Sequence, residues 1–392
     1  MRPGKKEKTV VYLHIGSQKT GTTAMQKLLN TNADALKRQS AVYPDFDLHF
    51  EGVDSNVNAH WLAAGEYDEQ TASACFEKIN ELADTYRTII LSDEILWNSA
   101  AHSTQFWENV RAHLREDIEL YMLAYVRRQD LYAYSFWAQQ VKAQKRYDFD
   151  TQSFSRFLEG KEFNRYYSKY MDYWKYAQAG IEVLGIDNVI FRVFERGQFA
   201  DGNLYADFFN AVGLSLTPDF KIPTQLENIS LKGNILEAKR YLNRTPEFSQ
   251  HGYRLLPYLV KAQKNMEESG TLRIRNDFPK EERLKLLKKY EKSNALIAKN
   301  MLNSKNGALF KDPVADDREP ASEYTTEEIL DACAQVMLVM MDECRRDEDA
   351  KGQLEEARRQ LEAIRRSHAY RVGRMITAPV RALKKAVRQR GK

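Results

Sequence analysis

The stretch that decides the fold is Gly16-Ser-Gln-Lys-Thr-Gly-Thr-Thr-Ala-Met-Gln26, which directly follows the apolar run Val10-Val-Tyr-Leu-His-Ile15. The run has the length and the β-branched residues of a buried strand. Two glycines then open a tight loop, and apolar residues recur at helical spacing from Met25 to Leu36. Strand, loop and helix N-terminus together form an anion site, because free backbone N–H groups and the positive end of the helix dipole point to one spot. We expect a phosphate-like or sulfate-like group to bind there.

The order of residues in the loop narrows the ligand. In a Walker A loop the lysine follows the second glycine, whereas here Lys19 precedes Gly21 and Thr22 takes the lysine's position. The order Lys-Thr-Gly-Thr-Thr resembles the 5′-phosphosulfate loop of sulfotransferases, which use 3′-phosphoadenosine 5′-phosphosulfate (PAPS). An ordinary βα turn is the alternative. The resemblance implies a set of nucleotide-binding residues: Ser17, Gln18, Lys19, Thr20, Gly21, Thr22 and Thr23.

A second predicted strand leads to a second nucleotide motif. Leu120-Tyr-Met-Leu-Ala-Tyr-Val126 runs into Arg127 and then into a helix that continues to about Lys145. Sulfotransferases carry an Arg at the end of a strand and a Ser eight residues later, which together hold the 3′-phosphate, and Arg127 and Ser135 have this spacing. A guanidinium fork and a hydroxyl suit phosphate oxygens. Arg128 is the alternative to Arg127, and a solvated helix start is the alternative for the pair.

Further stretches resemble the bacterial sulfotransferase-like branch of surface-polysaccharide pathways. They are His14-Ile-Gly16, Leu91-Ser-Asp-Glu94, the range 187–195, Asp207-Phe-Phe209, Asn228-Ile-Ser-Leu231 and Ser293-Asn-Ala295. The resemblance covers roughly residues 10 to 315. It implies an α/β fold with a P-loop-like parallel sheet flanked by helices, and a reaction that moves a sulfuryl group from PAPS to a hydroxyl of a glycan or related acceptor.

The coarse secondary structure agrees with such a sheet. Strands are expected at 10–15, 88–92, 120–126 and 188–194. Helices are expected at 22–38, 72–86, 104–115, 129–146, 164–179, 203–212, 231–243, 253–268, 280–303 and 326–346. Strands separated by helices favour a parallel sheet that is covered on both faces and binds ligands beyond the carboxyl ends of its strands. Lys19, Glu94 and Arg127 all follow predicted strands, so one crevice is expected to hold all three.

Sulfuryl transfer requires a cation near the leaving oxygen and a base near the acceptor. Lys19 is the candidate cation. Sulfotransferases use His or Glu as the base; Glu94 is preferred here and His60 is the other candidate. A helix-start carboxylate is the structural alternative for Glu94. His14 lies within a strand and is expected to be a core histidine, and no metal is expected to be required.

Composition bounds the class of protein. The chain has 392 residues, 43% of them hydrophobic and 29% charged, which is typical of a globular protein with a substantial core. Cys75, Cys333 and Cys344 form neither a metal-ligand pattern nor a disulfide framework. The N-terminus lacks the apolar core of a signal peptide, and no run of about 18 apolar residues is present. We expect a cytoplasmic enzyme.

The C-terminal segment differs from the rest in charge. We divide the chain into a tail at 1–9, a catalytic domain at 10–315, a linker and helix at 316–350 and a basic amphipathic helix at 351–392. The last segment holds 13 Lys and Arg and 3 Glu, a net charge of +10, against +4 for the whole chain. Basic amphipathic segments bind anionic membrane surfaces, so residues 365–392 are a candidate peripheral membrane anchor. A solvated or coiled-coil helix is the alternative, and no nucleic-acid motif accompanies the charge.

Three other functions stay open. The stretch Thr88-Ile-Ile-Leu-Ser-Asp-Glu94 looks like a Walker B strand, which would suit a P-loop phosphotransferase. A non-catalytic member that binds nucleotide or glycan is the second. A glycosyltransferase is the third, because Ser367–Arg374 and Pro379-Val-Arg381 resemble a tail of bacterial polysaccharide glycosyltransferases.

Overall fold

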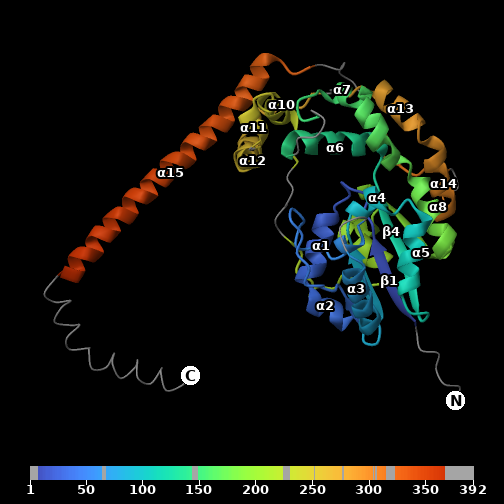
Figure 1. The fold of residues 1–392 in the computed structure, drawn as a ribbon. Helices are drawn as coiled ribbons and strands as arrows, with labels where there is room; N and C mark the ends of the chain where they lie inside the picture. The colour runs from blue at the N-terminus through green and yellow to red at the C-terminus, as the bar shows by residue number, and fades with distance from the viewer. Residues whose placement is uncertain are drawn as a thin grey trace, which may run out of the picture.

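The computed structural model describes residues 8–63, 68–143, 149–223, 230–250, 252–275, 278–302, 304, 307–314 and 323–366. Their centre is a five-stranded sheet, parallel throughout, with the order β2-β3-β1-β4-β5 (Figure 1). The strands are β1 (Thr9–His14), β2 (Ala41–Val42), β3 (Thr88–Ser92), β4 (Ile118–Val126) and β5 (Val189–Val193). The expected α/β class is confirmed. The edge strand β2 was not predicted, because two residues carry no alternation.

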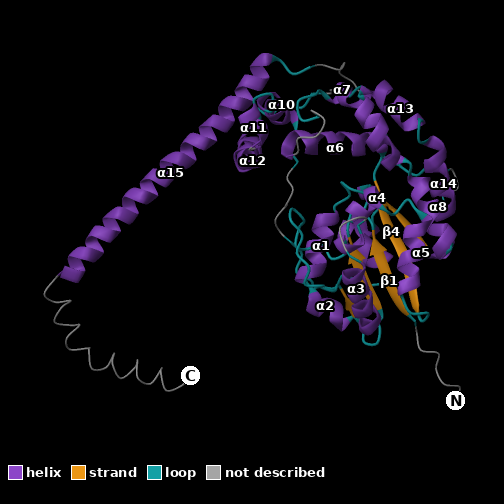
Figure 2. Cartoon of the chain, viewed as in Figure 1, coloured by secondary structure: helices purple, strands orange, loops and turns teal. Residues whose placement is uncertain are grey.

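Helices cover both faces of the sheet, as a buried parallel sheet requires (Figure 2). Leu13 of β1 and Leu91 of β3 point to one face, and Ile90 of β3 points to the other. The first face packs against α3 (Glu69–Leu82), α5 (Thr104–His113), α8 (Tyr173–Leu184) and α14 (Glu291–Met301). The second packs against α1 (Thr22–Thr31), α2 (Ala33–Arg38) and α9 (Leu204–Ala211).

A group of helices with a core of its own stands beyond the carboxyl ends of the strands. In Figure 1, α6 (Gln129–Ala143) lies between this group and the sheet. The other members are α7 (Phe154–Glu159), α10 (Gly233–Leu242), α11 (Pro246–Gln250), α12 (Gly252–Glu268), α13 (Lys280–Lys288) and α15 (Thr326–Arg366), of which α15 packs its first turns on α10 and α12. Short elements complete the described chain: α4 (Ile95–Ser99), 3₁₀ turns at His60–Leu62, Ser168–Met171, Ile186–Asn188, Arg196–Gln198 and Ala200–Gly202, and a π-helical turn at Phe163–Tyr167.

Several expected helices have different limits. The helix expected at 22–38 breaks at Asn32, whose side-chain amide donates to the carbonyls of Leu28 at 2.8 Å and Lys221 at 3.0 Å. These bonds tie the break to a distant loop, which no local pattern reveals. The helix expected at 280–303 breaks before Tyr290, which leaves the helical backbone region. By contrast, the helix that starts at Thr326 does not end at 346 but continues to Arg366.

Candidate functional site

The loop after β1 is held in place by its backbone. The N–H of Ser17 donates to the carbonyl of Tyr125 at 2.6 Å, and the N–H of Tyr125 donates to the carbonyl of Gly16 at 2.6 Å. Gly16, Lys19 and Gly21 have φ angles of +98°, +64° and +79°. Glycine adopts this region freely, but Lys19 does so at a cost, and such strained residues cluster at functional sites. The loop therefore has one defined conformation next to β4.

This conformation leaves a group of backbone donors without acceptors. Within the described part of the chain, no acceptor pairs with the N–H groups of five residues of the loop and first helical turn: Gln18, Lys19, Gly21, Thr22 and Thr23. Helix α1 has no side-chain cap and no acidic residue in its first turn. Donors of this kind are normally satisfied by a cap, water or a ligand, and the helix dipole favours an anion. An anion site at this loop stays a prediction, and these five N–H groups are the donors that it would use.

Two cations border the same loop. The Nζ of Lys19 donates to the side-chain oxygen of Gln139 at 3.4 Å, and the Nη1 of Arg127 donates to the carbonyl of Lys19 at 3.2 Å. Neither side chain forms an ion pair with a described residue. Burial lowers the pKa of Lys19, and the neighbouring Lys142 and Arg127 lower it further, while Glu94 raises it. Burial also lowers the pKa of Arg127, although a guanidinium stays charged in proteins. Both side chains are half-buried, and a half-buried charge without an ion-pair partner favours a bound anion.

The alternative arginine, Arg128, has a structural role instead. Its guanidinium binds Asp130 through bonds of 2.8 and 3.1 Å and donates to the carbonyls of Asp312 and Pro313 at 2.7 and 3.2 Å. It is buried and fully engaged. Of the two adjacent arginines, Arg127 is the one that faces the loop.

Glu94 reaches the loop from the end of β3. Its carboxylate accepts a hydrogen bond from the hydroxyl of Thr22, and a Cβ on Gly16 would lie 3.3 Å from its own Cβ. The N-terminus of α4 is served by Asp93, whose Oδ1 accepts from the N–H of Ile95 at 2.9 Å. Glu94 itself occupies the N-cap position of α4, but its side chain makes no capping hydrogen bond there. Burial raises the pKa of Glu94, while Thr22 and Lys19 lower it.

His60 contacts Asp93, the residue that precedes Glu94 in the sequence. Its Nδ1 is 2.7 Å from Oδ2 of Asp93, and the His60 residue is 6% exposed. Asp93 follows the end of β3, and its bond to His60 holds the imidazole ring near that end of the strand. His14 is fully buried, with Nδ1 2.9 Å from the hydroxyl of Ser92. Burial lowers the pKa of His14 to about 3, which agrees with a neutral core histidine.

One face of α6 completes the site. Ser135, Gln139 and Lys142 recur at i, i+4 and i+7, so they share one face of the helix. Gln139 contacts Lys19, and Lys142 lowers the pKa of Lys19, which shows that this face points to the loop. Ser135 is half-buried and has no hydrogen-bond partner among the described side chains. Gln139 and Lys142 were not recognised from the sequence, although their helical spacing from Ser135 was available as a signal.

The structure thus gathers most of the expected site. The loop residues, Glu94 and Arg127 meet at the carboxyl ends of β1, β3 and β4. No group of three or more His, Cys, Asp or Glu within the described ranges is arranged to hold a metal ion. Among the helices described, none has the length and apolar character needed to cross a membrane.

Comparison with known proteins gives limited matches. No family model matches the chain. An uncharacterised protein of Archaeoglobus fulgidus is 29% identical over 188 residues, which are 47% of this chain and 46% of that protein. The match thus spans about half of the curated relative. The crystal structure of a sulfotransferase from Alicyclobacillus acidocaldarius is similar with a TM-score of 0.34 and 14% identity, over 56% of this chain and 85% of that one.

Proposed function

We propose that the protein is a PAPS-dependent sulfotransferase that acts on a hydroxyl of a glycan or a related acceptor. The observation that carries the proposal is the set of five unpaired N–H groups between Gln18 and Thr23, next to the side chains of Lys19 and Arg127, neither of which forms an ion pair with a described residue. A ligand with two separate anionic groups fits this arrangement better than a single small anion, because the loop and the guanidinium offer two sets of donors.

The residues divide between the two ends of the nucleotide. The loop from Ser17 to Thr23 would hold the 5′-phosphosulfate on its N–H groups and hydroxyls. Arg127 would bind the 3′-phosphate through its free donors, with Ser135 adding a hydroxyl from α6. The stacking of Arg127 over Phe194, with the guanidinium carbon 5.6 Å from the ring centroid, limits the directions in which this side chain points.

The transfer itself is an in-line displacement. The acceptor hydroxyl oxygen bonds to sulfur as the bond between sulfur and the bridging oxygen breaks, and the acceptor loses its proton to a base. Lys19 would stabilise the negative charge that develops on the bridging oxygen, which stays with the nucleotide. Glu94 would accept the proton. Its raised pKa suits a base, since efficient general bases titrate near the working pH.

Glu94 is preferred over His60 because it contacts the loop. The bond from Thr22 places the Glu94 carboxylate next to the first turn of α1. His60 is paired with Asp93 and buried beside Phe50, with 5.1 Å between the two ring centroids. We assign His60 and Asp93 a supporting role that fixes the start of α4, from which Glu94 projects.

An assay of nucleotide release tests the proposal. The full-length protein is incubated with PAPS and a panel of polysaccharides, and the formation of 3′-phosphoadenosine 5′-phosphate is followed by chromatography, with and without a metal chelator. The expected result is acceptor-dependent release that survives chelation. Phosphate transfer from ATP that needs Mg²⁺ would instead identify a P-loop phosphotransferase, and nucleotide binding without turnover on any acceptor would identify a binding module.

A further inference from the structure

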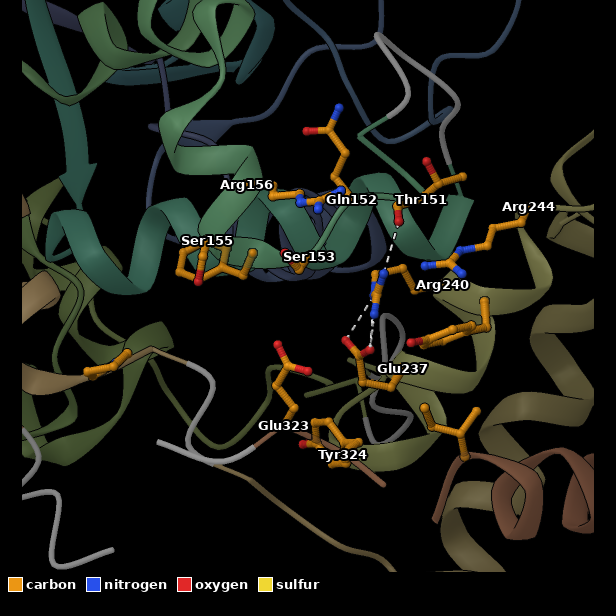
Figure 3. A pocket seen from close by; sticks show the side chains of 14 residues that line it. Thr151, Gln152, Ser153, Ser155, Arg156, Glu237, Arg240, Arg244, Glu323 and Tyr324 are labelled. Carbon is orange, nitrogen blue, oxygen red and sulfur yellow. Dashed lines mark hydrogen bonds and ion pairs between the residues drawn. The ribbon is translucent and has the colours of Figure 1, made fainter. Parts of the chain in front are cut away.

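A large cavity lies in the helical part of the molecule, away from the loop. Its volume is about 920 Å³, which is near the upper end for ligand pockets in proteins (roughly 300–1,000 Å³). Four separate segments line it: residues 151–156 at the start of α7, residues 237–244 of α10 and the turn after it, Pro279 just before α13, and residues 323–329 at the start of α15 (Figure 3).

The wall of the cavity carries positive charge that is not neutralised. Arg240 is fully engaged: it binds Glu237 through bonds of 3.1, 2.9 and 2.6 Å and donates to the carbonyl of Thr151 at 3.0 Å. Arg156 and Arg244 are exposed and form no ion pair with any residue that the structure describes. Arg244 stacks on Tyr241 with its guanidinium carbon 4.2 Å from the ring centroid, so its position is defined while its donors stay free. Two guanidiniums are thus available to an anionic ligand.

The rest of the lining shows what kind of anion fits. Ser153, Ser155 and Gln152 offer hydroxyl and amide groups, and Glu323 contributes a carboxylate to the same cavity (Figure 3). A carboxylate accepts hydrogen bonds from hydroxyls but repels phosphate and other dense anions. A ligand that carries acidic groups for the arginines and hydroxyl donors for Glu323 satisfies both. An acidic oligosaccharide has this chemistry.

Helix α6 separates the cavity from the loop. The indole N–H of Trp137 donates to the carbonyl of Gln152 at 2.9 Å on the cavity side, whereas Gln139, about 200° further around the helix, contacts Lys19. A helix with its side chains is about 10 Å across, so one sugar ring cannot reach both places. A ligand that reaches both must be a chain of several sugar residues.

We infer that this cavity binds an acidic oligosaccharide and holds the distal part of the acceptor chain whose hydroxyl is modified at the loop. Arg156 and Arg244 bind its acidic groups. The identification as acceptor rests on the proposed sulfuryl transfer, but binding in the cavity does not.

Calorimetric titration of the full-length protein with a galacturonate hexamer tests the inference, with the fully methyl-esterified hexamer as the neutral probe of equal length. We expect the acidic hexamer to bind at least about tenfold more tightly than the ester, since bonds between charged partners are among the strongest hydrogen bonds. The double substitution Arg156→Ala and Arg244→Ala should lower the affinity for the acidic hexamer by about tenfold or more. Arg196→Ala is the matched control. Arg196 is exposed and lies outside the cavity, so its loss should leave the affinity for the acidic hexamer unchanged.

Three results would overturn the inference: equal binding of both hexamers, no effect of the double variant, or an equal effect of the control. Polyglutamate of similar length is titrated as well, and if it binds as tightly as the acidic hexamer, the cavity recognises charge rather than sugar. Titration with 3′-phosphoadenosine 5′-phosphate is run on every variant. Hexamer binding without nucleotide binding would leave the cavity site standing while the proposed function fails, and the reverse result would do the opposite.

Discussion

The Nη1 of Arg127 donates a hydrogen bond to the backbone carbonyl of Lys19 at 3.2 Å, across 108 residues of sequence. This bond joins the end of β4 to the loop after β1, and with it the two segments that we assign to the two ends of one nucleotide. Because Arg127 is otherwise unpaired with acidic groups among the described residues, most of its donors remain free for a ligand. The relationship makes Arg127 the first residue to test.

The substitution Arg127→Ala is expected to lower the affinity for 3′-phosphoadenosine 5′-phosphate by roughly ten- to hundredfold, because a charge-assisted contact contributes about 1.5–3 kcal/mol. Binding of AMP should change much less, since AMP lacks the 3′-phosphate. Calorimetry on both nucleotides measures this. If the wild-type protein binds the two nucleotides equally, the 3′-phosphate assignment is wrong.

Its neighbour gives a contrasting control. Replacing Arg128→Ala leaves Asp130 buried with only the more distant Arg283, whose Nη1 lies 3.6 Å from it. Breaking a buried pair from one side typically costs about 3–5 kcal/mol. We therefore expect Arg128→Ala to lower the free energy of unfolding, measured by denaturant titration. Arg127→Ala should instead lower chiefly the affinity for the nucleotide.

Lys19 is expected to act mainly in the transition state. Lys19→Ala should reduce turnover by about 100- to 1,000-fold, as the loss of one donor to a developing charge does, while nucleotide affinity falls less. Lys19→Arg should restore little, because a planar guanidinium occupies the loop differently. Turnover close to normal in the alanine variant would show that Lys19 is a binding residue or lies outside the site.

The sequence predicted those parts of the site that depend on residues close to one another in the chain. The loop and the strand that carries it were predicted because Gly16, Gly21 and the apolar run before them set the backbone directly. Gln139 was missed although it lies one helical turn after Ser135, because its contact with Lys19 depends on where α6 lies beyond the ends of the strands. The sequence left Arg127 and Arg128 open, because both follow the same strand, and only the buried partner Asp130 separates them.

The fold shows the same division. Parallel strands with apolar runs were predicted within a few residues, whereas the break at Asn32 depends on Lys221, a residue of a distant loop. The cavity at Arg156 and Arg244 was not anticipated at all, since four segments that lie far apart in the sequence build it. The stretch Asn228-Ile229 and the tail beyond Arg366 lie outside the described residues, so expectations for them stay predictions.

Glu94 is expected to make stability depend on pH. Burial raises the pKa of Glu94 in the folded state, so the folded protein is more stable against unfolding when Glu94 is protonated than when it is ionised. The stabilisation by the proton is complete below the unfolded pKa of about 4.3 and is lost as the pH rises through the folded pKa. Glu94→Gln imitates the protonated carboxyl. It should unfold at the same denaturant concentration as the wild type at about pH 4, but at a higher concentration than the wild type at about pH 8. A difference that does not vary with pH would contradict the assignment.

The same variant separates the two candidate bases. Glu94→Gln should reduce transfer sharply, and the turnover that remains should lack the acid limb of the pH profile, because the amide accepts no proton. His60→Gln should reduce turnover but keep that limb, since His60 would act only by holding Asp93 in place. The opposite pattern would make His60 the base.

Gly21 is expected to tolerate no side chain. At φ +79° an L-residue costs about 1–2 kcal/mol, and a Cβ there would also lie 2.7 Å from Cδ2 of Leu204. Gly52 has a similar φ of +77° with nothing within 4 Å, so Gly52→Ala should show the backbone cost alone. Denaturant titration and nucleotide calorimetry on both variants should show a larger loss of stability, and a loss of binding, only for Gly21→Ala.

The last prediction concerns the basic tail. From Arg365 to Lys392 there are ten basic residues and no acidic one, interleaved with apolar residues. Each Lys or Arg near an anionic leaflet contributes about 1 kcal/mol, and only some of them face the lipid at once, so binding should be reversible and sensitive to salt. In vesicle co-sedimentation, the full chain should bind phosphatidylserine-containing vesicles, bind neutral ones less, dissociate in high salt and lose all binding when residues 351–392 are removed. If the full and truncated chains both stay in the supernatant at low salt, the tail pairs with another helix instead, and sedimentation equilibrium of the two forms would reveal that association.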